Sequence, residues 1–88
     1  MTTITLTADD ALVLFELLAR EIDDRKSVRL AGMIDHPAEF WALNGVFGDL
    51  QRQLAEPFRA DYGELVDAAR ERIMEISDPE RTFVVAGS

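Results

Sequence analysis

The sequence predicts a mainly α-helical fold, a three-helix domain to which short β-strands at the two termini could be added. Three segments repeat their apolar residues at helical spacing, and each is preceded by residues that favour a helix start. With 88 residues, 48% of them hydrophobic, the chain is expected to form a single helical domain over residues 1–88. We expect neighbouring helices to pack antiparallel where their connections are short.

The first helix is expected from about residue 8 to residue 24. Thr7 precedes it as an N-cap whose hydroxyl can accept a backbone hydrogen bond, and two aspartates follow at the positive end of the helix dipole. A broad apolar stripe is formed by Ala11, Leu12, Leu14, Phe15, Leu18, Ala19 and Ile22. Because Val13 and Leu17 fall outside this stripe, the helix is expected to be covered on more than one side.

A loop and a second helix are expected next. Residues 25–35 mix charged residues with Ser27 and Gly32, which indicates a loop with at most one short helical turn. A helix is then expected from Pro37 to about residue 55, because proline favours the first turn and either Asp35 or His36 can cap it. Its apolar face contains Phe40, Leu43, Val46, Phe47, Leu50 and Leu54.

A third helix is expected after Asp61, which stands three residues before Glu64 in the spacing of a capping box. Its apolar face contains Tyr62, Leu65, Val66, Ala69, Ile73 and Ile76. Residues 3–6 and 82–85 are rich in β-prone residues. They could pair with each other as short strands, or the tail could be loose.

The composition excludes several classes of function. Without cysteine the chain has no disulfide framework, no thiolate metal site and no cysteine nucleophile. Its net charge of −8 repels phosphate groups, so neither nucleic acid nor an anionic membrane is an expected partner. No apolar stretch is long enough to span a bilayer and no signal-peptide pattern is present, so a cytoplasmic location is expected.

No residue pattern indicates catalysis, a metal or a cofactor. His36 stands at a predicted helix start, without a cysteine partner or an HExxH spacing, and we interpret it as a cap rather than a general base. The acidic residues lie on polar helix faces, which is typical of a solvated surface rather than a carboxylate metal site. The chain is therefore predicted not to be an enzyme, and an enzyme that pairs His36 with a carboxylate is the least favoured alternative.

One side of the second helix is a candidate interaction surface. Trp41 lies opposite the apolar face, and the residues beside it are Asn44, Gly45, Gly48 and Arg52. Each glycine costs a helix interior about 1 kcal/mol relative to alanine, which the close approach of another element would explain. That element is either the first helix or the 25–35 loop of the same chain, or a second chain anchored by Trp41 and Arg52.

Val13 and Leu17, on the first helix, are a second candidate contact. Because a domain of this size has a marginal core, these two apolar residues favour self-association as a homodimer.

The chain also resembles a group of small uncharacterised bacterial all-helical proteins. The resemblance rests on three segments, which are ALVLFELLAR at 11–20, HPAEFWALNGVFGDLQRQL at 36–54 and EPFRADYGELVDAAR at 56–70. These are packing and capping patterns rather than catalytic motifs. The resemblance therefore implies the helices and no activity.

Small size, acidity and the absence of a chemical site favour a non-enzymatic protein–protein interaction module. An immunity-type or antitoxin-type inhibitor of a basic toxin is one form that such a module could take, because opposite charges attract the partner. The alternative is a structural or accessory subunit that associates only with itself.

Overall fold

The computed structural model describes residues 2–86, and these are mainly α-helical, as predicted. The α-helices are α1 (Ala8–Leu18), α2 (Val28–Ala31), α3 (Pro37–Gln53) and α4 (Tyr62–Ser77). A π-helical segment, η1 (Ala19–Asp24), continues α1, and a 3₁₀ turn, η2 (Glu56–Phe58), stands between α3 and α4. The short α2 is the one helical turn allowed for in the 25–35 loop.

The predicted helix starts are confirmed for α1 and α3. The Thr7 hydroxyl accepts a hydrogen bond from the backbone N–H of Asp10 at 3.0 Å. His36, not Asp35, caps α3 through Nδ1, which accepts from the backbone N–H of Ala38 at 3.0 Å. The predicted cap of α4 is wrong in its detail, because the Asp61 carboxylate binds the Arg59 guanidinium instead of a helix N–H.

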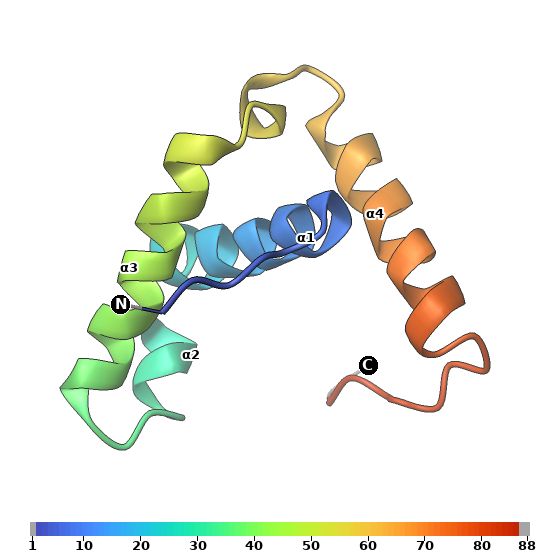
Figure 1. Cartoon of the computed structure of the whole chain (residues 1–88). Helices are drawn as coiled ribbons and strands as arrows, with labels where there is room; N and C mark the ends of the chain where they lie inside the picture. Colours follow the sequence, from blue (N-terminus) through green and yellow to red (C-terminus); the bar gives the residue numbers. More distant parts are fainter. Residues whose placement is uncertain (1, 87–88) are drawn as a thin grey trace.

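The helices form an open shape like the letter A (Figure 1). The two legs are α3 and α4, which meet near η2 and diverge from it, and α1 is the crossbar between them. Both legs make their main contacts with α1 rather than with each other. Antiparallel packing was expected only where connections are short, and the eight-residue connection with η2 at its centre instead leaves an open angle between α3 and α4.

The core is divided into two small clusters along α1. On the α3 side, Phe15 and Leu18 are buried against Phe47 and Leu50, with the Phe15 and Phe47 ring centroids 5.4 Å apart. On the α4 side, the buried residues are Leu12, Val66 and Ala69. This confirms that α1 is covered on two sides, while each leg contributes only a short apolar patch to the core.

Two contacts fix α4 against α1. The Arg72 guanidinium binds the Asp9 carboxylate through two hydrogen bonds, of 2.9 Å from Nε and 2.8 Å from Nη2. The Tyr62 ring meets the Phe15 ring edge-on, with centroids 6.5 Å apart, and Tyr62 packs against both clusters. Tyr62 is therefore the link between the two halves of the core.

Several sequence expectations fail at the edges of this fold. Within residues 2–86, the segments 3–6 and 82–85 form no strand, so the short terminal strands that the sequence allowed for are absent. Val46 and Ile76, both predicted to face the core, are exposed. For Ile76 the reason is the divergence of the legs, which carries the last turns of α4 away from α1 and α3.

Candidate functional site

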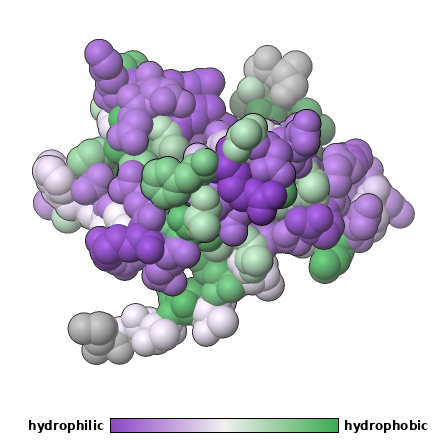
Figure 2. All heavy atoms as spheres, turned by 90° about the horizontal axis from the view of Figure 1, so that it is seen from above, coloured by the Kyte–Doolittle hydropathy of each residue, from purple (hydrophilic) through white to green (hydrophobic). Residues whose placement is uncertain are grey.

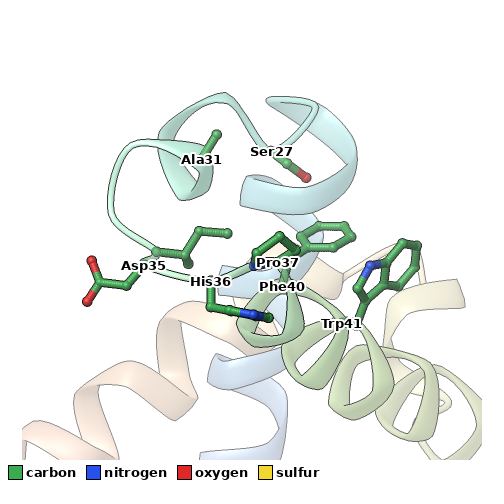
Figure 3. Close-up of a pocket in the computed structure, with 8 residues that line it drawn as sticks. Ser27, Ala31, Asp35, His36, Pro37, Phe40 and Trp41 are labelled. Carbon is green, nitrogen blue, oxygen red and sulfur yellow. The ribbon is translucent and has the colours of Figure 1, made fainter.

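An apolar groove of about 420 Å³ lies between α2 and the start of α3 (Figure 3). Its lining is mostly apolar, with polar groups at the rim, and consists of Ser27, Ala31, Ile34, Asp35, His36, Pro37, Phe40 and Trp41. Trp41 forms one wall, and the Asp35 carboxylate points away from the other lining side chains. A hollow of this size can take one or two side chains of a bound peptide or protein.

His36, at the rim of the groove, is engaged in capping the start of α3. Besides the His36 cap, the Glu39 carboxylate accepts hydrogen bonds from the backbone N–H groups of Asp35 at 2.7 Å and His36 at 3.3 Å. This completes a capping box in which side chains at both ends of the first turn satisfy its free N–H groups. Since Nδ1 of His36 is an acceptor, the proton of the neutral ring is on Nε2. The His36 ring therefore serves the helix, as predicted.

Trp41 is the most prominent apolar side chain of the groove. Its indole packs edge-on against Phe40, with ring centroids 5.0 Å apart, yet 63% of the residue remains exposed. Val28 and Met33, from the facing segment, are exposed as well. A large exposed aromatic beside a groove is the kind of residue that anchors a protein partner.

The α2 wall of the groove is held by a buried carboxylate. Glu21, only 6% exposed, lies in η1 and accepts hydrogen bonds from Arg29 at 2.8 Å to Oε1 and 2.5 Å to Oε2. These bonds, with a further one from Arg20, lower the pKa of Glu21 to about 2 against the cost of burial. The ion pair ties α2 to the end of the first helix and so fixes the position of the groove.

The other predicted residues of this helix side form an open surface next to the groove. Apart from its chain neighbours and the nearby backbone of its own helix, no atom lies within 4 Å of the position where a Cβ on Gly45 would stand, so no other element of the described chain covers that glycine. Asn44 is half-buried, and the exposed Arg52 pairs with Asp49 and lies near Gly48. Cover by the same chain, the first of the two alternatives for this surface, does not hold at Gly45.

The two predicted residues of α1 have different environments. Val13 is half-buried and packs against the cluster of Leu12, Val66 and Ala69, whereas Leu17 is exposed. Neither residue lines the groove. The structure therefore does not bring these two residues together with Trp41 into one site.

Sequence reasoning missed two apolar hollows of this fold. One wall of the first hollow consists of Ala31 and Ile34, which belong to the segment predicted as a loop. The sequence indicated a helical turn there through the spacing of its apolar residues Val28, Leu30, Met33 and Ile34. A second hollow of about 460 Å³ forms where the extended N-terminal segment lies along α1 and α3, and Ile4, Leu6, Leu14 and Val46 are among its lining residues. Its signal was the alternation of polar and apolar residues at 3–6.

The groove offers apolar contacts along its walls and polar groups at its rim. Across residues 2–86, no group of three or more His, Asp or Glu side chains is placed to hold a metal ion. Within the same range, no helix is both long and apolar enough to cross a membrane.

The chain was compared with protein-family models, curated proteins and solved structures, and none of them matches it.

Proposed function

We propose that this chain is a non-enzymatic protein-interaction module whose hydrophobic core is completed by another protein chain. The observation that carries the proposal is the size of its surface. The chain exposes 6851 Å², whereas a compact monomer of 9.9 kDa exposes about 5,200 Å². Each molecule thus carries roughly 1,650 Å² of surface that a compact fold would bury.

The dimensions of the molecule support the same reasoning. Its Cα radius of gyration is 14.1 Å, whereas a compact domain of 88 residues has one of about 12 Å. Part of the difference comes from the extended ends, and part from the diverging legs α3 and α4.

The extra surface is rich in apolar side chains. Seen from the η2 side, apolar atoms interrupt the mostly polar exterior in several places (Figure 2). Among residues 2–86, the exposed large hydrophobic residues are Ile4, Leu6, Leu17, Val28, Met33, Trp41, Val46, Phe58, Ile76, Phe83, Val84 and Val85. Stable obligate complexes bury about 1,000–2,500 Å² on each partner, so the surplus is of the size that a permanent partner covers.

A basic partner protein is the second candidate, in the manner of an immunity-type or antitoxin-type inhibitor. The observation that favours it is the outward face of α4, where Glu64, Asp67, Glu71 and Glu75 are all exposed. With a net charge of −8 on the whole chain, such a face accelerates the encounter with a basic surface. Salt discriminates between partners, because it weakens binding to a basic partner but strengthens association between two acidic chains.

Dye binding tests the proposal. The isolated, diluted chain should bind the hydrophobic dye ANS while it retains a cooperative thermal transition and its near-ultraviolet circular dichroism, which distinguishes it from a molten globule. Covering the surface by association should displace the dye. A diluted chain that binds no ANS would contradict the proposal, because its apolar side chains would then be buried within one molecule.

A further inference from the structure

Because the proposed function requires a partner chain, we infer that the partner is a second copy of the same protein. We propose that the apolar C-terminal tail of each copy, defined here as residues 82–85, inserts Phe83 into the groove beside Trp41 of the other copy. The inference rests on the proposed function, and it adds the partner and the contact.

The tail is presented to solvent by a structured turn. The Asp78 carboxylate accepts hydrogen bonds from the backbone N–H of Thr82 at 3.0 Å, from the Thr82 hydroxyl at 2.8 Å and from the backbone N–H of Phe83 at 3.0 Å. Arg81 binds the Glu71 carboxylate of α4 at 2.7 Å. These bonds fix the direction in which the chain leaves α4, so Phe83 is held in place although 81% of it is exposed.

Groove and tail are complementary in chemistry. The tail has the sequence Thr-Phe-Val-Val, without a charged side chain. Its trace after α4 is drawn out rather than coiled (Figure 1), and along such a backbone neighbouring side chains point to opposite sides, so Phe83 can enter a hollow while Val84 faces the other way. The groove offers Ala31, Ile34, Pro37, Phe40 and Trp41 as apolar walls in about 420 Å³. An aromatic ring against Trp41 and Phe40 also gains the offset or edge-on contacts that aromatic pairs favour.

Charge distribution limits where two copies of this chain can touch, and these two surfaces meet that limit. Two chains of net charge −8 repel each other, so they can associate only where the touching parts carry little charge. The tail carries no charged side chain. At the groove, the Asp35 carboxylate points outward and the Glu39 carboxylate is engaged in the α3 capping box.

The placement of the two surfaces allows a reciprocal exchange. Both α2, with the groove, and the tail lie at the end of the molecule away from η2, and the tail turns back from α4 across the open side (Figure 1). When two copies meet at this end, the tail of each can enter the groove of the other. Such a reciprocal contact is what a two-fold symmetric dimer requires. The contact is then made twice, and it covers apolar surface that each monomer leaves open.

Trp41 is the only tryptophan of the chain, so its fluorescence reports on the groove directly. In the wild-type protein, raising the concentration should shift the Trp41 emission to shorter wavelength and protect it from acrylamide, as the mass rises from 9.9 kDa to twice that value. Phe83→Ala should weaken dimerisation by roughly thirtyfold per contact, or about a thousandfold for two contacts. Phe58→Ala, at an 86% exposed phenylalanine on η2, is the matched control and should dimerise like the wild type.

Mixing two variants isolates one contact. The Phe83→Ala chain keeps its groove and Trp41, whereas a Trp41→Ala chain keeps its tail and has no tryptophan. Titrating the second into the first should shift the emission of the only tryptophan present, with an affinity roughly thirtyfold below that of the wild-type dimer. Adding a chain that carries both substitutions should cause no shift.

Three results would overturn the inference. The first is a Phe83→Ala chain that dimerises like the wild type, and the second is a mixture in which Trp41 stays solvated. The third is a wild-type chain that remains a monomer at all concentrations. In that third case ANS binding separates the two proposals: a monomer that binds the dye refutes only the second copy, and a monomer that does not bind it refutes the interaction module as well.

Discussion

Replacing Phe47 with alanine tests whether the small cluster between α1 and α3 holds the fold together. Phe47 is only 4% exposed, and its ring contacts that of Phe15 in a cluster with Leu18 and Leu50. A Phe→Ala change at such a site costs about 3–5 kcal/mol, from lost burial and the cavity left behind. A chain of 88 residues has an unfolding free energy of about 4–13 kcal/mol, so the substitution removes a large part of it.

Urea unfolding followed by far-ultraviolet circular dichroism measures this loss. Phe58→Ala is the control, because a substitution at an exposed site should change the unfolding free energy by no more than about 0.5 kcal/mol. The reasoning would be refuted by a Phe47→Ala protein that unfolds within about 1 kcal/mol of the parent, a loss well below that of a buried aromatic. In that case α3 would be held by contacts other than this cluster.

Three further predictions concern single residues. Gly45→Ala should raise the unfolding free energy by about 0.5–1 kcal/mol, because a Cβ there meets no other element and alanine favours the helix. A lower unfolding free energy in urea melts would contradict the open surface at this glycine. The Arg29 bonds lower the pKa of Glu21 from 4.5 to about 2, so their stabilisation is present above about pH 4.5 and is lost as the pH falls towards 2. In urea melts between pH 2 and pH 4.5, the unfolding free energy of Glu21→Gln should depend less on pH than that of the wild type. The same pH dependence in both proteins would rule out a stabilising role for the ionised Glu21. Asp78→Ala should free the tail and weaken dimerisation in sedimentation experiments, whereas an unchanged dissociation constant would show that the turn has no part in association.

The helices themselves could be read from the sequence because their signals are local. The Thr7 hydroxyl and the His36 ring reach backbone N–H groups only two or three residues away, so the residue order alone indicates these caps. The apolar face of α3 follows in the same way from its spacing, and Phe47 and Leu50 are buried as expected.

The arrangement of the helices could not be read in this way. Apolar periodicity shows which face of a helix seeks cover, but not which element supplies the cover. The prediction that Ile76 is buried assumed that α4 packs along its whole length, whereas its last turns diverge from the rest of the fold. Likewise, residues 3–6 and 82–85 have strand-like composition and form no strand, because composition does not indicate whether another segment lies beside them in strand register.

The candidate site was predicted in part. Trp41 and Gly45 were placed on the side of α3 opposite its apolar face, but their position on the helix left open whether the same chain or a second chain covers them. The structure leaves both residues exposed. The α2 wall was missed, since its position depends on the ion pair between Glu21 and Arg29, eight residues apart in sequence. The turn that holds Phe83 was also missed, because it arises from an aspartate at the end of α4 whose bonds run to residues four and five positions later.

Small-angle X-ray scattering of the monomer tests the central claim, which is that this chain alone leaves its core open. The measurement uses a dilution at which the scattering mass is 9.9 kDa, so that a single chain is observed. The account predicts a radius of gyration near the 14.1 Å of the structure. A monomer of about 12 Å, the value for a compact domain of this length, would contradict it, because the apolar surface proposed for a partner would then be covered within one molecule.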